Sequence, residues 1–288
     1  MKTFPRPSSY PERDEVAEKY GLNVVYRMSH NESPLGPSPK AVAALAEAAQ
    51  DLGHYPPMGD GILRQTLAET LGRDLTPDHF YSGCSGYETI ELLMRAYLQA
   101  GDEVIVSPPT FGAYYKVIST CHGVAVDVPL LKPTYTPDID GILDAVTERT
   151  RFLMVCNPNN PTGHIMPAEQ MDRLVTELPP HVTIIADEVY YHFVTAPSFP
   201  DSIRYVLENR DIVVIHSFSK AYGLPGLRMG YGIAKPEIAD RVGGIHRGFH
   251  QNKLNLAAGV AALKDQAHLQ QNVQAVIDGR DWIQEQLD

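Results

Sequence analysis

The sequence predicts an α/β fold with a mostly parallel sheet that helices cover on both faces. Short apolar runs rich in β-branched residues, at residues 152–156, 182–186 and 212–215, indicate buried strands. The segments between these runs are long enough for one helix each, and this alternation is typical of parallel βαβ units. The same alternation continues on both sides of these three strands.

Start and stop signals place the other elements. Ser38 and Pro39 form a typical helix start, and Gly53 is expected to end that helix. A short helix at about residues 12–20 lies within an arm rich in Pro and polar residues, 1–36. Further helices are expected at residues 61–71, 88–99, 114–120, 138–147, 167–178, 201–208, 237–245, 256–263 and 267–287. Further strands are expected at residues 103–106, 124–128 and 231–234.

The composition excludes several classes of partner. The 288 residues are 43% hydrophobic and 20% charged, which is ordinary for a globular protein of about two domains. A formal net charge of −11 argues against nucleic acid and against an anionic membrane surface as partners. The three cysteines, Cys84, Cys121 and Cys156, show no CxxC spacing and lie near apolar sequence, so we expect buried, reduced thiols.

A cytoplasmic location is expected from the same sequence. Residues 1–7 lack the apolar core of a signal peptide. No apolar run approaches the length that spans a membrane.

Polar side chains follow each of the three central strands. Asn160 comes shortly after the first strand, Asp187 directly after the second, and Lys220 shortly after the third. Because the carboxyl ends of parallel strands meet at one edge of a sheet, where ligands bind, we expect these three side chains to share one site. An amide, a carboxylate and an amine would then line the same edge.

The surroundings of Lys220 suit a carbonyl compound that also carries a phosphate. Ser217 and Ser219 place hydroxyl groups beside the lysine, and Arg228 can bind two phosphate oxygens at once. A lysine amine can form an imine with a carbonyl group. Pyridoxal phosphate is a ligand of this kind, although the same residues taken alone would also fit a surface loop.

Taken together, these motifs resemble the fold-type-I aminotransferases of classes I and II, and among them the histidinol-phosphate aminotransferase-like branch. The motifs are Asn-Asn-Pro-Thr-Gly at 159–163, Asp-Glu-Val-Tyr at 187–190, Ser-x-Ser-Lys at 217–220 with Arg228, and the arm segment 31–39. The resemblance covers nearly the whole chain. It implies a three-layer large domain with a mostly parallel seven-stranded sheet, and a homodimeric enzyme of amino-acid biosynthesis that depends on pyridoxal phosphate.

The resemblance implies Lys220, Asp187 and Tyr190 as catalytic residues. Lys220 would bind the cofactor aldehyde covalently and then move protons, while Asp187 would pair with the ring nitrogen and keep it protonated. Tyr190 and Asn160 would hydrogen-bond the ring oxygen. From the residues alone, Asp187 could also be a helix N-cap, and the asparagine pair 159–160 a plain turn.

Five residues are expected to hold the cofactor phosphate. Gly86 and Tyr87 stand at the start of a helix, where backbone N–H groups and the helix dipole attract an anion. Ser217, Ser219 and Arg228 would complete this site. Many relatives carry Asp at the position of Tyr87, and only backbone contacts would survive that change.

Two aromatic residues complete the expected site. Phe111 matches the ring that stacks on the cofactor in relatives, although an isolated Phe more often belongs to a core. Tyr55 matches a tyrosine that reaches the phosphate of the neighbouring subunit, which implies a homodimer with composite sites; otherwise it is a turn residue before Pro-Pro. His246 and His250 are four residues apart, but no third ligand accompanies them, so no metal is expected.

The expected reaction moves an amino group from a small amino acid or an amino alcohol phosphate to a 2-oxo acid. A decarboxylase or lyase on the same scaffold and a non-catalytic cofactor-binding remnant stay open as alternatives. The arm resembles that of histidinol-phosphate enzymes, but Leu35 replaces a Tyr that many of them carry. The expected domains are the arm (1–36), the cofactor-binding large domain (37–265) and the start of a truncated small domain (266–288).

Overall fold

The computed structural model describes residues 13–287, which fall into two compact units, Met1–Glu32 and Ser33–Asp288. The first unit contains α1 (Arg13–Tyr20), in agreement with the helix expected at about residues 12–20. Residues 1–12, which are part of the expected arm, lie outside the described residues. Within residues 13–287, none of the helices combines the length and the apolar character that crossing a bilayer requires.

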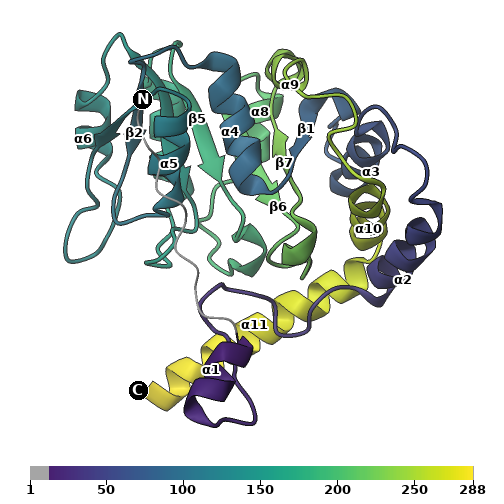
Figure 1. Ribbon diagram of the computed structural model, residues 1–288. Coiled ribbons are helices and arrows are strands. Elements are labelled where there is room, and N and C mark those ends of the chain that lie inside the picture. The colour runs from purple at the N-terminus through teal and green to yellow at the C-terminus, as the bar shows by residue number, and fades with distance from the viewer. Residues whose placement is uncertain (1–12, 288) are drawn as a thin grey trace. The chain divides into compact units, whose positions relative to one another are not determined.

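The second unit is built on a seven-stranded sheet (Figure 1). Its strands are β1 (Phe80–Gly83), β2 (Glu103–Val106), β3 (Val124–Asp127), β4 (Thr150–Cys156), β5 (Thr183–Asp187), β6 (Ile212–Ser217) and β7 (Gly230–Ile233). Their order is β1-β7-β6-β5-β4-β2-β3, and only β7 runs antiparallel to its neighbours. The expected mostly parallel sheet of seven strands is therefore confirmed.

The helices of the second unit agree closely with the sequence signals. They are α2 (Pro39–Ala48), α3 (Gly61–Leu71), α4 (Gly86–Tyr97), α5 (Ala113–Thr120), α6 (Ile139–Asp144), α7 (Ala168–Glu177), α8 (Ser202–Leu207), α9 (Pro236–Gly243), α10 (Lys253–Leu263) and α11 (Gln266–Leu287). Ser38 caps α2, because its side chain accepts hydrogen bonds from the N–H groups of Lys40 and Ala41. The helix expected at 138–147 is shorter, because the N–H of Thr147 bonds to the side chain of Thr150 in a turn.

Alternation along the strands produces two cores, one on each face of the sheet. Val104 and Val106 of β2 belong to a core that includes residues of α4, α5 and α9, whereas Ile105 belongs to the other core, with residues of α3, α7, α8 and α10. Figure 1 shows α4 and α5 crossing one face of the sheet. Because both faces are buried, the parallel strands are apolar throughout, which makes them easy to recognise in the sequence.

Strand β1 was not expected from the sequence. Its residues, Phe-Tyr-Ser-Gly, include only two apolar side chains, so the segment has no clear strand pattern. The strand forms because it pairs with β7 at the edge of the sheet, with Gly83 opposite Gly230. This pairing carries the start of α4 to the same edge of the sheet as the ends of the central strands.

Candidate active site

The structure brings together the three polar residues that follow β4, β5 and β6. Within the sheet, Asp187 pairs with Cys156 on one side and with Ile215 on the other. Beyond the strands, Asn160 Nδ2 lies 3.5 Å from the hydroxyl of Tyr190, to which it donates. Lys220 Nζ lies 5.4 Å from the centre of the Tyr190 ring. An amine, an amide and a phenol therefore meet beside the carboxylate.

Asp187 is a buried acid that neutral donors hold in place. Its Oδ2 accepts a hydrogen bond of 2.6 Å from the Tyr114 hydroxyl, and its Oδ1 accepts one of 3.3 Å from the Val189 N–H. Burial raises the pKa of Asp187 to about 6, although Tyr114, Val189 and the charge of Lys220 oppose this shift. A cation beside this carboxylate would restore its charge, so the site suits a ligand with a protonated ring nitrogen.

The N-cap interpretation of Asp187 is wrong. The next helical segment, the 3₁₀ helix η3 (Tyr191–Phe193), has Tyr190 as its N-cap. The bond from the Val189 N–H to Asp187 closes only a local turn.

Phe111 lies beside the tyrosine that binds Asp187. Its ring meets the Tyr114 ring edge to face, with centroids 5.5 Å apart and planes at 85°. Phe111 is 39% exposed, so it is not a core residue. An exposed aromatic face next to a buried carboxylate is the arrangement that a flat cationic ring requires.

The start of α4 forms an anion cradle against β7. The N–H groups of Gly86 and Tyr87 lie in the first turn of α4, where no carbonyl group of the helix can accept from them. A Cβ atom on Gly230 of β7 would overlap the backbone nitrogen of Gly86, so only glycine allows this close approach. The turn before α4 holds Ser85 at φ 95° and ψ 162°, a region that glycine normally occupies.

Ser217, Ser219 and Arg228 lie beside this cradle, because a Cβ atom on Gly86 would come within 3.8 Å of the Ser217 side chain. The Ser217 side chain accepts from the N–H of Ser219 at 3.1 Å, and both serines are buried. Arg228, in the left-handed region with φ 54°, donates from Nη1 to Ser219 Oγ at 3.4 Å. A guanidinium, two hydroxyls and a helix N-terminus together can hold a phosphate dianion.

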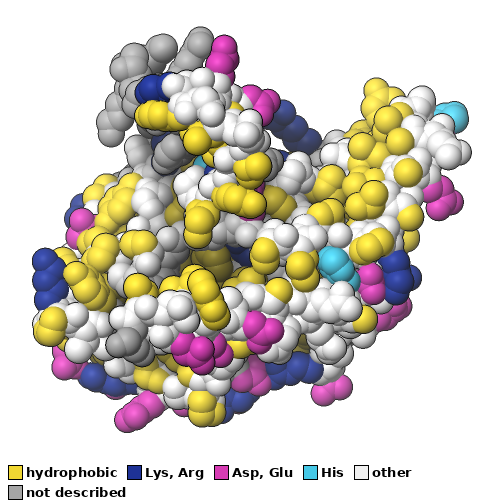
Figure 2. Space-filling view, turned by 90° about the horizontal axis from the view of Figure 1, so that it is seen from below, with side chains coloured by type: hydrophobic (Ala, Val, Ile, Leu, Met, Phe, Trp, Pro, Cys, Tyr) yellow, Lys and Arg dark blue, Asp and Glu magenta, His cyan; other side chains and the backbone are white. Residues whose placement is uncertain are grey.

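A phosphate at this cradle would have to be held by local donors, because the formal net charge of the protein is −11. Figure 2 shows acidic and basic side chains scattered among hydrophobic ones on the face seen from below the view of Figure 1. Among the described residues, the Lys and Arg side chains seen on that face are scattered and do not form one patch. Attraction of a phosphate therefore depends on the cradle itself.

The expectation of buried cysteines is met by Cys121 alone among the three. Cys84 is exposed, because it stands in the turn between β1 and α4, and Cys156 is half-buried.

Tyr55 is 81% exposed, and its ring packs on Phe249 at 4.9 Å. Its expected role concerns a second copy of the chain, so that role stays a prediction.

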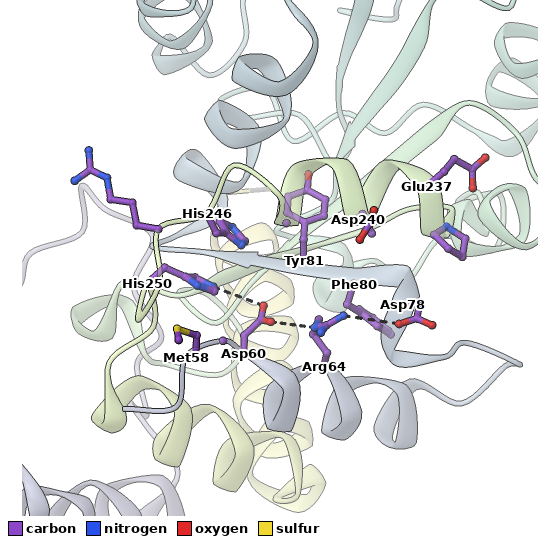
Figure 3. A pocket seen from close by; sticks show the side chains of 16 residues that line it. Met58, Asp60, Arg64, Asp78, Phe80, Tyr81, Glu237, Asp240, His246 and His250 are labelled. Carbon is purple, nitrogen blue, oxygen red and sulfur yellow. Dashed lines mark hydrogen bonds and ion pairs between the residues drawn. The ribbon is translucent and has the colours of Figure 1, made fainter. Parts of the chain in front are cut away.

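A separate cleft of about 710 Å³ lies beside β1 and contains none of the expected site residues. Figure 3 shows Asp60 at its floor, paired with Arg64 at 3.0 Å and with His250 at 3.7 Å. Ser82 also donates to Asp60, at 2.7 Å. The His250 ring stacks on His246 with centroids 3.9 Å apart. Asp60, Arg64 and His250 thus have protein partners within this cleft.

Comparison with known protein families identifies the group to which this site belongs. The family model described as aminotransferase class I and II matches residues 23–288. The chain belongs to this family. Membership confirms that the protein is an enzyme, that it transfers amino groups between amino and oxo compounds, and that its cofactor is pyridoxal phosphate.

Similar proteins cover most of this aminotransferase. The histidinol-phosphate aminotransferase of Moorella thermoacetica is 37% identical over 96% of the chain and 70% of the relative. That of Akkermansia muciniphila is 38% identical over 91% of the chain and 71% of the relative. The structure of the Sinorhizobium meliloti histidinol-phosphate aminotransferase with pyridoxal-5′-phosphate matches with a TM-score of 0.86 and 27% identity, over 96% of this chain and 74% of that one. These likenesses do not favour a decarboxylase or a non-catalytic remnant.

Sequence reasoning missed three residues of the aminotransferase site. Tyr114 was expected only as part of a helix, yet it binds Asp187 directly. Gly230 and Ser85 shape the cradle through backbone geometry. Of the three, Gly230 had the clearest signal, because it directly precedes the predicted strand 231–234, and a glycine in a strand often marks a close approach of another backbone.

Proposed function

We propose that this aminotransferase moves the amino group of a small amino compound of the histidinol-phosphate type to a 2-oxo acid. The observation that carries this proposal is the likeness to curated histidinol-phosphate aminotransferases, at 37% and 38% identity over nearly the whole chain. Leu35, which is half exposed, is a position at which the substrate preference of this chain can differ from that of its relatives.

The cofactor is proposed to lie between Asp187, Phe111 and the cradle at α4. Bound pyridoxal phosphate supplies an aldehyde that takes up the substrate amine and a ring that accepts electrons from the α-carbon. Asp187 would hold the ring nitrogen and Phe111 would cover one face of the ring. Ser217, Ser219 and Arg228 would bind the phosphate together with the N–H groups of Gly86 and Tyr87.

Lys220 is proposed to be the covalent attachment point and the group that moves protons. Its amine lies over the Tyr190 ring, and Asn160 donates to the hydroxyl of the same tyrosine. These contacts support the proposal that Tyr190 and Asn160 hold a ring oxygen close to the amine. A base within hydrogen-bond reach of the α-carbon proton is what transfer of the amino group requires.

A homodimer with shared sites is proposed on the basis of Tyr55. Its 81% exposure and its place at the surface leave its hydroxyl available to a second copy of the chain. We propose that it reaches the phosphate held by the partner subunit. Replacement by Phe should then weaken cofactor binding without changing the unfolding temperature of the apoprotein.

The domain division and the cytoplasmic location also stay proposals. Residues 37–265 would form the cofactor-binding domain and residues 266–288 the start of a smaller one; the chain spans 70% to 74% of the length of the three relatives compared above. Three free cysteines, one of them exposed, support a reducing compartment.

A donor screen tests the proposed reaction. The purified full chain is incubated with pyridoxal phosphate, 2-oxoglutarate and single amino donors, among them histidinol phosphate and aromatic amino acids, and glutamate is measured. We expect glutamate with histidinol phosphate, and a loss of at least about 10²–10⁴-fold in Lys220→Ala. The exposed Lys264→Ala serves as the matched control. Release of carbon dioxide, or cofactor binding without turnover of any donor, would contradict the proposal.

A further inference from the structure

Tyr114 makes the shorter of the two hydrogen bonds to Asp187. Its hydroxyl lies 2.6 Å from Oδ2, against 3.3 Å for the backbone bond to Oδ1. Tyr114 itself is buried, in the first turn of α5, while Asp187 ends β5. The bond thus ties the helix that follows β2 to the predicted anchor of the cofactor ring.

The phenol must be the donor in this bond. Burial and the neighbouring Asp187 charge raise the pKa of Tyr114 well above its usual value, so it keeps its proton at neutral pH. Asp187 therefore accepts this hydrogen bond. When it is charged, either oxygen can accept, and when it is protonated, only the oxygen without the proton can. A donor fixed in this way favours the charged form of the acid.

The other groups that face Asp187 do not replace this donor. Glu188, next to it in the chain, raises the pKa of Asp187, and the more distant charge of Lys220 lowers it. The Cys156 thiol, across the sheet from Asp187, keeps its proton, because burial raises its pKa to about 12. The Tyr114 bond is therefore the strongest side-chain influence that keeps the carboxylate charged.

We propose that Tyr114 is a positioning residue that holds Asp187 ionised and directed at the ring nitrogen of the cofactor. The role of the ring nitrogen rests on the proposed function; the action of Tyr114 on Asp187 does not. Through its edge-to-face contact with Phe111, the same side chain also sets the aromatic wall on which the ring lies. Tyr114 would touch neither substrate nor cofactor, and would act through Asp187.

The adjacent Tyr115 provides a matched control. It donates to Asp127 at 2.7 Å, so the bond has almost the same length, but Asp127 is exposed and lies outside the site. Tyr114→Phe and Tyr115→Phe each remove one hydroxyl from a tyrosine of α5. They differ in the burial of the carboxylate that loses its donor.

The titration of Asp187 tests the proposal on the full-length apoprotein. The carboxyl carbon is followed by ¹³C NMR and assigned by its absence in Asp187→Asn. We expect the midpoint to rise by about 1–2 pH units in Tyr114→Phe, because a charged hydrogen bond is lost, and to stay unchanged in Tyr115→Phe. We also expect Tyr114→Phe to bind pyridoxal phosphate at least about tenfold more weakly than wild type. An unchanged Asp187 midpoint in Tyr114→Phe would overturn the proposal.

A second measurement covers the case in which Tyr114→Phe fails to fold. In the wild-type protein, the hydroxyl proton of Tyr114 should give a downfield signal, which moves upfield as Asp187 is protonated and in Asp187→Asn. A Tyr114 hydroxyl signal that shifts neither on protonation of Asp187 nor in Asp187→Asn would contradict the proposal. Both NMR readouts use the apoprotein, so a failure of every amino donor would count against the proposed function and leave this inference standing.

Discussion

Two of the buried aspartates lie in different surroundings, Asp60 at the cleft beside β1 and Asp187 at the ends of β4, β5 and β6. They are 6% and 5% exposed, so burial raises the pKa of both. At Asp60, the contact with His250, the hydrogen bond from Ser82 and the charge of Arg64 outweigh burial and lower the pKa to about 2. At Asp187, the phenol of Tyr114 and a backbone N–H do not outweigh it, and the pKa rises to about 6.

We propose that this difference separates a structural acid, Asp60, from a functional one, Asp187. The partners of Asp60 include basic groups of the protein in direct contact, so its charge is already neutralised (Figure 3). Asp187 instead accepts hydrogen bonds from neutral donors, and its charge costs stability until a cation arrives. A buried carboxylate in this state beside an exposed aromatic ring supports the proposal that a cationic ring binds there.

Asp187→Asn should have the largest effect, and it should fall on activity. We expect kcat/KM to fall by about 10²–10³-fold, the size found when one preorganised polar group is removed from an active site. Because the change also removes a buried charge, the free energy of unfolding at pH 7 should not fall. Steady-state kinetics and urea unfolding measure the two quantities. A large loss of stability without loss of activity would reverse the roles assigned to the two aspartates.

Asp60→Asn should show the opposite pattern. Arg64 and His250 lose the charge that faces them, and we expect the free energy of unfolding to fall by about 2–3 kcal/mol. Activity per folded molecule, with saturating cofactor, should stay within about twofold of wild type. Urea unfolding and active-site titration separate these effects. An activity loss comparable to that of Asp187→Asn would show that the cleft takes part in the reaction.

The pH dependence of stability should differ in sign between the two aspartates. The pKa of Asp60 is lowered on folding, so its stabilisation is present above about pH 4 and is lost as the pH falls towards 2. The pKa of Asp187 is raised, so the native apoprotein loses about 2 kcal/mol as the pH rises from about 4 to 6. The free energy of unfolding is measured from urea curves at each pH. Its dependence on pH should become weaker between about pH 2 and 4 in Asp60→Asn, and between about pH 4 and 6 in Asp187→Asn. Identical curves for both variants would contradict this assignment.

Ser85→Gly should have the smallest effect, because it relieves strain at the cradle without changing either aspartate. Glycine occupies φ 95° and ψ 162° freely, whereas serine there costs about 1–3 kcal/mol. The serine side chain also accepts from the N–H of Glu88, and losing this cap offsets a few tenths of that gain. We expect the apoprotein to be stabilised by about 1 kcal/mol. Destabilisation would mean that Ser85 holds the cradle through contacts of its side chain.

The sequence predicts the site residues that come at or after the ends of the central strands. Lys220, Asp187 and Asn160 each come after an apolar run, and parallel strands necessarily bring such residues to one edge. The layers were predictable for the same reason, since buried parallel strands are apolar along their whole length.

The rest of the site depends on contacts that no local pattern encodes. Tyr114 and Asp187 are 73 residues apart, and their hydrogen bond exists only because α5 packs against the end of β5. The cradle needs Gly230 opposite the start of α4 and a strained Ser85, and both features are properties of the folded backbone. The pKa difference between the two aspartates likewise follows from their neighbours in space, since the residue type is the same.

The titration of the Asp187 carboxyl with and without pyridoxal phosphate tests most directly whether Asp187 binds the protonated ring nitrogen of the cofactor. In the apoprotein, the ¹³C midpoint should lie near pH 6. With saturating cofactor we expect it to fall by about 1–3 units, because a positive charge then faces the carboxylate. A midpoint that stays near 6 in the presence of bound cofactor would show that Asp187 does not hold the ring.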